Sequence, residues 1–349
     1  MEKAIDTQRS GASDRLTAPS GAAYLLGRIG DQLVPALFLL VLVIGLSLLS
    51  PNFLSISNFL DIARVVSIIG IMAVGMTLVI LTRGIDLSVG ATFALAGSVT
   101  ASFVPGNFSD GPTSIGINLP APLAIAAGLL VGAGIGFVNG FIIAKSRVEP
   151  FIVTLATMTF VRGLTYLCTG GFPTIFRPIP AAFEWVGQGF VLGLPTPTIF
   201  FALVIAAGVW ITRRTTFGRS IYAIGGNEAA ARLSGIDVRR VKILAYTIMG
   251  GLAALSGIIL SSRVAAAEPT AGVGYELDVI AGVVIGGTSL LGGRGSVIST
   301  VLGVFILGVI SNGLNIVGVA TYYQLVAKGL LLIVAVGLDA QLRKKQRIC

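Results

Sequence analysis

The chain has 349 residues, of which 54% are hydrophobic and only 11% are charged. Soluble domains carry about 25% charged residues, so this composition excludes an ordinary globular enzyme and predicts an all-α integral membrane protein. The net charge is +9, but the basic residues lie in short loops between apolar stretches and no nucleic-acid-binding motif is present, which argues against nucleic acid as a partner. Histidine, the most common general base and transition-metal ligand, is absent from the sequence.

The predicted elements follow from apolar length. Residues 1–31 are mixed and polar and predict a flexible cytoplasmic tail, whereas residues 32–340 predict a transmembrane domain. A spanning helix needs about 20 mostly apolar residues. Ten stretches are candidate spans: Leu33–Ser50, Phe59–Leu81, Leu87–Val104, Pro122–Ala144, Phe151–Gly170, Thr198–Ile211, Val241–Ser261, Leu277–Leu291, Val297–Val317 and Tyr323–Leu338. The sixth and eighth are short, and the glycine-rich segment Gly286–Ser296 predicts a break or bend in the eighth.

Basic residues predict the orientation of these spans. With the N-terminus in the cytoplasm, the inner segments hold 19 Lys or Arg residues and the outer segments hold only Arg177 and Arg263. Ten spans return the C-terminus to the cytoplasm, where the basic tail 341–349 can meet anionic lipid. The outer loop Gly171–Pro197 divides the spans into five plus five. That division is typical of inverted repeats, although no residue-level repeat is found.

Four glycines of the fourth span follow one another at a spacing of four and therefore share one helix face. They are Gly128, Gly132, Gly136 and Gly140. Small residues on one face let helix backbones approach closely in lipid. The pattern predicts tight helix packing, with a subunit interface or a moving contact as the alternative.

Several ionisable residues lie in or beside the spans, and their positions predict structural or functional roles. Asp86 either caps the third span or places a carboxylate near the inner mouth of a solute path. Arg162, deep in the fifth span, either snorkels to the interface or pairs with a carboxylate of another span. Glu276 and Asp278 are expected to cap the eighth span, with contact to a partner or solute as the alternative, and Lys328 is expected to snorkel to the outer face.

One polar segment, Thr212–Lys242, interrupts the apolar chain and carries seven Lys or Arg residues. Its centre has the signals of a short helix. Asn227 can cap the start, Glu228 suits the positive end of the helix dipole, Arg232 can pair with Glu228, and Gly235 ends the helix. The segment is either a solvated surface turn or a helix presented to a partner.

The sequence has no phosphate-binding loop, no metal-ligand cluster and no Ser/His/Asp set. The glycine-rich segment Gly286–Ser296 lacks the GxxxxGK[ST] pattern that nucleotide binding requires. We therefore expect no cofactor on this chain and no enzymatic activity of its own. The energy for any transport has to come from an ion gradient or from another subunit.

Four segments resemble the ribose/xylose/galactose-type permeases of bacterial ABC importers. They are GIDLSVGATFALAGS (Gly84–Ser98), FIVTLATMTFVRGL (Phe151–Leu164), TTFGRSIYAIGGNEAAARLSGIDV (Thr215–Val238) and VIGGTSLLGGRGSV (Val284–Val297). The resemblance runs from about Pro35 to Leu338, and the branched-chain amino acid permeases are more distant relatives with a similar layout. It is specific for the family and much less so for the sugar.

The resemblance implies partners and roles. Such permeases work as a pair of subunits in the bacterial inner membrane, with a periplasmic sugar-binding protein that delivers the solute and a cytoplasmic ATPase that uses ATP and Mg. The segment NEAAARLSG then matches the helix that docks on the ATPase, formed by Asn227, Glu228, Ala229, Ala230, Arg232, Leu233, Ser234 and Gly235. Candidates for the pathway of a neutral, hydroxyl-rich solute are Asp86, Ser88, Phe93, Asn139, Thr154 and Thr157.

Other functions remain as alternatives at this point. The solute could be a polyol or a branched-chain amino acid, because the resemblance identifies the family better than the substrate. A proton- or sodium-coupled transporter is disfavoured because histidine is absent and most acidic residues lie in loops or at span ends. An intramembrane enzyme is disfavoured because no nucleophile and base are recognisable.

Overall fold

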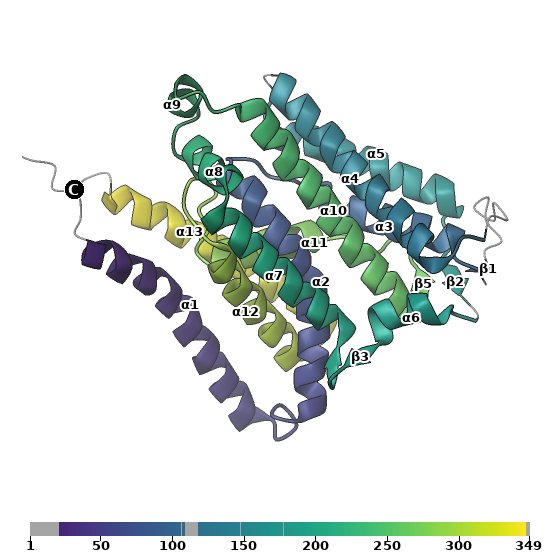
Figure 1. Cartoon of the computed structure of the whole chain (residues 1–349). Coiled ribbons are helices and arrows are strands. Elements are labelled where there is room, and N and C mark those ends of the chain that lie inside the picture. The colour runs from purple at the N-terminus through teal and green to yellow at the C-terminus, as the bar shows by residue number, and fades with distance from the viewer. Residues whose placement is uncertain (1–20, 106, 109–117, 147, 177, 347–349) are drawn as a thin grey trace, which may run out of the picture.

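The computed structural model describes residues 21–105, 107–108, 118–146, 148–176 and 178–346, which form a helical bundle with two small sheets (Figure 1). The helices are α1 (Gly21–Leu49), α2 (Ile56–Leu81), α3 (Val89–Phe103), α4 (Ala121–Lys145), α5 (Pro150–Thr169), α6 (Ala181–Gln188), α7 (Thr196–Arg214), α8 (Thr216–Gly226), α9 (Glu228–Leu233), α10 (Val238–Val264), α11 (Tyr275–Ile285), α12 (Val297–Ile316) and α13 (Thr321–Gln346). The strands are β1 (Asn107–Phe108), β2 (Thr174–Phe176), β3 (Phe190–Val191), β4 (Leu194–Pro195) and β5 (Ala266–Ala267).

The strands all lie in loops that were predicted to face outward. β2 is the middle strand of an antiparallel β1-β2-β5 sheet, with Phe108 opposite Ile175 and Thr174 opposite Ala267. β3 and β4 form a separate antiparallel pair. The prediction of an all-α membrane protein is thus confirmed, with very short strands that join its outer loops to one another.

Each of the ten predicted spans overlaps one helix, and α6, α8 and α9 are additional helices in the connecting segments. Helix α1 begins at Gly21, so residues 21–31 of the predicted tail are helical, and residues 1–20 lie outside the described residues. Helix α13 continues to Gln346 and includes most of the predicted basic tail. The cytoplasmic location of both termini and the inverted repeat stay predictions.

Two of the ten predicted spans are too short to cross a bilayer alone. Helices α3 and α11 have 15 and 11 residues, which correspond to about 22 Å and about 16 Å at a rise of about 1.5 Å per residue. The hydrocarbon core is about 30 Å thick. By contrast, α2, α4, α5, α7, α10 and α12 are each long and apolar enough to span. The third predicted span therefore has to be corrected to a helix of about three quarters of the spanning length. The predicted break in the eighth span is confirmed by the end of α11 at Ile285.

The N-terminal ends of the two short helices meet inside the bundle. A β-carbon on Gly90, in the first turn of α3, would overlap the carbonyl oxygen of Gly272, which lies just before α11. The rings of Phe93 and Tyr275 pack edge to face at 5.3 Å across the same contact. From this meeting point α3 runs toward β1 and α11 runs toward the loop that bonds to the end of α2, so the two short helices lead to opposite ends of the bundle.

Helix α10 occupies the centre of one half of the bundle and packs against α4, α3 and α2 (Figure 1). The glycine face of α4 lies against it. A β-carbon on Gly136 would overlap the carbonyl oxygen of Tyr246, and one on Gly140 would lie 2.7 Å from the Cα of Ile243. Gly128 differs from the others, since its neighbours are Thr100 of α3 as well as α10. Because the backbones of α4 and α10 approach so closely, this face of α4 has room only for glycine.

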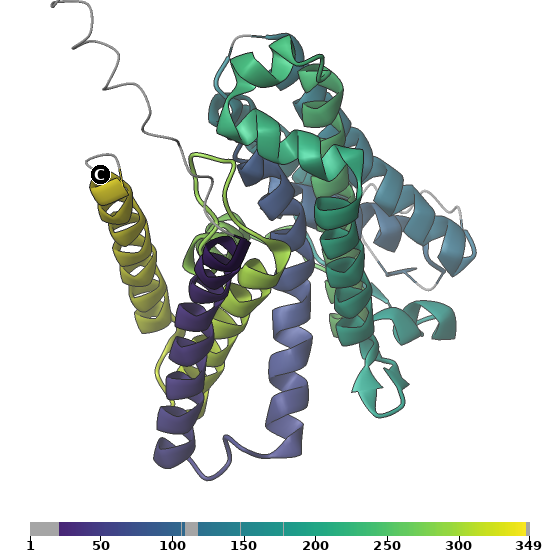
Figure 2. The ribbon, with the colours of Figure 1, turned by 60° about the vertical axis from the view of Figure 1, so that its left-hand side comes forward.

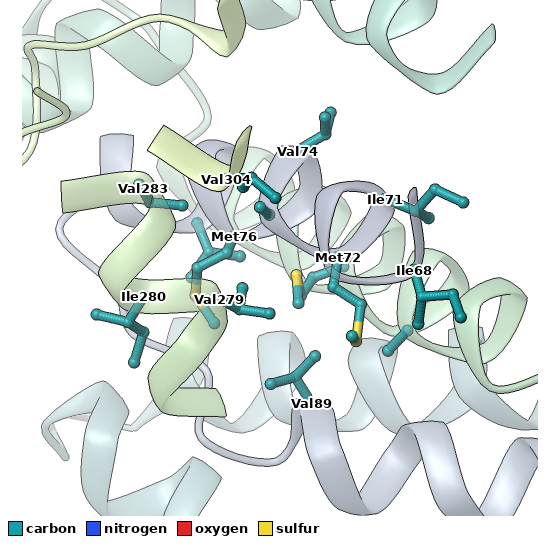
Figure 3. Close-up of a cluster of buried hydrophobic side chains, with 14 of the residues drawn as sticks. Ile68, Ile71, Met72, Val74, Met76, Val89, Val279, Ile280, Val283 and Val304 are labelled. Atoms are coloured by element: carbon teal, nitrogen blue, oxygen red, sulfur yellow. The ribbon is translucent and has the colours of Figure 1, made fainter. Parts of the chain in front are cut away.

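The hydrophobic core joins α2 to both short helices and to α12. Figure 3 shows side chains of α2, among them Met72 and Met76, next to Val89 of α3, Val279 of α11 and Val304 of α12. All five are at most 1% exposed. Helix α2 therefore packs against α11 and against the first residue of α3.

Helices α1 and α13 lie at the edge of the bundle, apart from α4 and α5 (Figure 2). Helix α1 contacts α12, and α13 contacts α11 and α12. An ion pair of 2.9 Å between Lys328 of α13 and Asp278 of α11 joins the two helices. Lys328 was expected to snorkel and Asp278 to cap α11, and the structure shows that each is instead the partner of the other.

The replacement Gly136→Val is expected to destabilise the protein by about 1–3 kcal/mol or more, because the new side chain overlaps the backbone of α10. Gly134→Val is the matched control, since Gly134 lies on the exposed side of the same helix with no atom within 4 Å of its β-carbon position. Thermal unfolding of the purified proteins in detergent measures the difference. Equal melting temperatures for the two variants would contradict the close α4–α10 contact.

Candidate functional site

Helix α9 forms from local signals of its own sequence. The Asn227 side chain accepts a hydrogen bond of 3.1 Å from the backbone N–H of Ala230, which caps the first turn. The Ser234 hydroxyl donates to the Ala230 carbonyl at 2.9 Å near the other end. Gly235 then has a φ of +83°, a left-handed conformation that favours glycine and stops the helix. The helix is short, but both of its ends are fixed.

Glu228 carries two ion pairs at the start of α9. Arg232 lies one turn later at 3.2 Å, and Lys242, on α10, lies at 2.8 Å. Partial burial favours the neutral carboxyl, but the hydrogen bonds and charges of Lys242 and Arg232 outweigh it, so the pKa of Glu228 is lowered. Glu228 is therefore ionised at neutral pH. The Lys242 ion pair holds α9 against the start of α10, whereas the Arg232 ion pair lies within α9.

The two faces of α9 differ in chemistry. Ala231 is 4% exposed and packs with Ile221, Ile224 and Val238 beneath it. Leu233 is 90% exposed on the other side, although a leucine in water gains nothing from folding. The helix is thus anchored through one small side chain and presents an apolar side chain outward.

Arg83 connects this segment to the start of α3. Its Nε and Nη2 atoms donate to the carbonyl oxygens of Gly225 and Gly226, at 2.8 and 2.7 Å, which end α8 just before α9. The Gly293 N–H donates to the Leu81 carbonyl at 3.1 Å, so the loop after α11 reaches the same point. The end of α2, the end of α8 and the loop after α11 therefore meet directly behind α9.

A buried polar network follows Arg83 along the chain. Oδ1 of Asp86 accepts hydrogen bonds from the backbone N–H and the hydroxyl of Ser88, at 2.9 and 2.6 Å. Ser88 Oγ accepts from Asn139 Nδ2 at 2.9 Å, and Asn139 Oδ1 accepts from Thr157 Oγ1 at 2.6 Å. Thr154 donates to the Ile85 carbonyl at 3.2 Å. The network ties the turn before α3 to both α4 and α5.

Five of the six predicted pathway residues thus lie in one cluster, although they come from three separate segments. The exception is Phe93, which packs against Tyr275 on the far side of the turn. Asp86, Ser88, Asn139 and Thr154 are at most 1% exposed, so in this conformation they line no open passage. Asp86 does not cap α3 directly either. It closes the turn ahead of the helix, whose N-cap, Ser88, makes no side-chain capping bond.

Residues 58–336 match the family described as the permease component of the branched-chain amino acid transport system. The chain belongs to this permease family. It is 50% identical to the ribose import permease RbsC of Escherichia coli strain K12 over 310 residues, which cover 88% of this chain and 92% of that relative.

Further relatives extend the similarity to other bacteria and solutes. The ribose import permease of Bacillus subtilis is 48% identical over 90% of this chain and 94% of its own length. The L-arabinose permease AraH of Escherichia coli strain K12 is 38% identical over 95% of this chain and 98% of its own length. No solved structure matches the chain.

Three polar contacts of the permease were not predicted from its sequence. Lys242 reaches Glu228 from another helix, and Arg83 holds the end of α8. Arg162 has no carboxylate partner among the described residues, and its Nη1 atom donates to the carbonyl oxygens of Pro269 and Ala271 at 2.7 and 3.0 Å. All three join segments far apart in the chain, and no local sequence pattern signals such a contact.

In the permease variant Thr157→Val, the buried Oδ1 atom of Asn139 loses its donor, so we expect destabilisation by about 1–3 kcal/mol. Thr159→Val is the matched control. Thr159 is exposed two residues further along α5, and among the described residues its hydroxyl bonds to the Leu155 carbonyl of its own helix. Thermal unfolding in detergent measures both. A control as destabilised as Thr157→Val would mean that the network contributes no stability.

Proposed function

We propose that this permease is the membrane-spanning subunit of an ATP-binding cassette importer, which moves a monosaccharide of the ribose, xylose or galactose kind across the bacterial inner membrane. The observation that carries the proposal is the 50% identity with a ribose import permease over 88% of the chain. Relatives named for D-allose and L-arabinose, two other monosaccharides, are 40% and 38% identical. Ribose is therefore the first sugar to test.

The proposed partners are a cytoplasmic ATPase, a periplasmic sugar-binding protein and a second copy of this chain. Helix α9 is the proposed contact for the ATPase. In support, it is fixed at both ends, held by two ion pairs of Glu228, and presents Leu233 to solvent. An exposed apolar side chain on an ordered helix gains free energy when a partner covers it.

The proposed mechanism is alternating access driven by the ATPase. Movement of α9 is passed through the end of α8 to Arg83, and from there to the turn that carries Asp86. The hydrogen bonds of Ser88, Asn139 and Thr157 then break in one state and form in the other. The sugar shifts this equilibrium only by binding one state more tightly than the other.

The polar network suits a neutral, hydroxyl-rich solute. Its serine, threonine and asparagine side chains donate and accept hydrogen bonds with each other in the closed conformation. When the turn before α3 moves away from α4 and α5, the same groups become available to sugar hydroxyls. A site of this kind replaces one set of hydrogen bonds with another and leaves few polar groups unpaired.

Transport by purified components tests the proposal. Proteoliposomes that contain the permease, the ATPase encoded beside it and the binding protein encoded beside it are expected to accumulate radiolabelled ribose only when ATP is enclosed with the ATPase. Leucine is the comparison solute, because the description of the matched family names branched-chain amino acids. Leucine accumulation would select that second function, and ribose uptake by the permease alone under a pH gradient would overturn the ATP-driven mechanism.

The role of α9 is tested by Leu233→Asp, which is expected to weaken ATPase binding at least about tenfold, because a charged side chain replaces an apolar one at the contact. Folding should be unaffected, since Leu233 is 90% exposed. Leu192→Asp is the matched control: Leu192 is 99% exposed in the loop between β3 and β4, at the other end of the bundle. Pull-down of the ATPase from detergent measures binding.

Two larger changes to α9 test the same proposed contact with the ATPase. Glu228→Lys places a third cation beside Arg232 and Lys242, and deletion of residues 229–233 removes the body of α9. Both variants are expected to insert into the membrane and to lose ATPase binding and transport. If the ATPase is retained by Leu233→Asp and by both of these variants, α9 is not the docking helix.

A further inference from the structure

A hollow of about 490 Å³ opens beside α9, between the start of α10 and the turn that joins α4 to α5. The elements that line it include α9 and the start of α10, which lie at one end of the bundle (Figure 1). Its wall includes five cationic side chains, contributed by four separate segments: Arg83, Lys145, Arg232, Arg239 and Lys242. Only two carboxylates, Glu149 and Glu228, oppose them.

The five positive charges are only partly neutralised. Arg232 and Lys242 share the single carboxylate of Glu228. Arg83 donates to backbone carbonyls, which carry no net charge. Within the described part of the chain, neither Lys145 nor Arg239 has an ion-pair partner, and Lys145 contacts only the ring of Phe141, at 5.5 Å. The hollow therefore keeps a net positive charge at neutral pH.

The backbone adds to this charge. Helix α5 has 20 residues and begins at Pro150, which lines the hollow. Pro150 has no N–H and the Ile152 N–H donates to the Glu149 carbonyl at 3.1 Å, so the helix end contributes chiefly the partial positive charge of its dipole, which favours anions. Side chains and a helix end thus point to the same kind of ligand.

We propose that this hollow binds a phosphate group, either the headgroup of an anionic phospholipid or a soluble phosphorylated compound. A phosphate offers several acceptor oxygens and suits a site in which arginine and lysine side chains converge from different segments. Arg232 and Lys242 belong both to the hollow and to the ion pairs of Glu228. A bound phosphate competes with Glu228 for these cations and so connects occupancy of the hollow to the position of α9.

The test is equilibrium binding of radiolabelled inorganic phosphate to the full-length permease in nanodiscs of zwitterionic phosphatidylcholine. The double variant Lys145→Glu with Arg239→Glu is expected to bind at least about tenfold more weakly, because both unpaired cations are reversed. The matched control is Arg213→Glu with Arg219→Glu, which changes the net charge equally at two exposed residues that do not line the hollow. Gel filtration confirms that each variant is folded.

A variant with raised affinity for phosphate tests the same site even if a charge reversal disturbs the fold. Glu149→Gln removes the carboxylate of the hollow that has no ion-pair partner among the described residues, and it is expected to bind phosphate more tightly than the wild type. The proposal is overturned if the wild type binds no better than the Lys145/Arg239 variant, or if the Arg213/Arg219 control loses binding to the same extent.

The lipid composition of the nanodisc distinguishes a lipid headgroup from a soluble phosphorylated compound. In nanodiscs that contain phosphatidylglycerol, weaker binding of inorganic phosphate, together with retention of this lipid by the wild type but not by the Lys145/Arg239 variant in native mass spectrometry, identifies a lipid headgroup. Unchanged binding of inorganic phosphate identifies a soluble ligand. Either result supports the site, because each depends on the same two cations.

Discussion

The absence of water inside a bilayer constrains this fold more than any other condition, since backbone N–H and C=O groups there need partners within the protein. Helices α3 and α11 are too short to span, so the segments around them depend on contacts from elsewhere. Arg162 bonds to two carbonyls before α11, Tyr246 donates to the Ile85 carbonyl before α3, and the Gly293 N–H bonds to Leu81. These contacts satisfy backbone groups of the irregular segments before and after the two short helices, and transporters bind their solutes beside such interrupted helices.

Features that depend on neighbouring residues could be predicted from the sequence. The cap of α9 at Asn227, its stop at Gly235 and the pair Glu228–Arg232 all follow from spacing within a few residues, and the structure has each of them. The glycine face of α4 is equally local, because a repeat of four defines one side of a helix. The sequence left open what this face meets, and the structure places it mainly against α10.

Features that depend on packing could not be predicted. The apolar stretch around α3 is nearly long enough for a span, and hydropathy does not tell where the chain stops being helical. Asp86, Asn139 and Thr157 were identified singly as pathway candidates, but their common hydrogen-bond network requires three segments to be positioned together. Lys242 is 14 residues from Glu228 in the chain, a separation at which no helical spacing brings two side chains together.

The two buried methionines of α2 have a consequence for movement. Met72 and Met76 lie where α2 meets the short helices, among β-branched valines and isoleucines that have few rotamers. A methionine side chain is unbranched and changes rotamer easily, so it fills space of altered shape. The contact between α2 and α11 is therefore a part of the core whose side chains adapt easily to a change in the position of either helix.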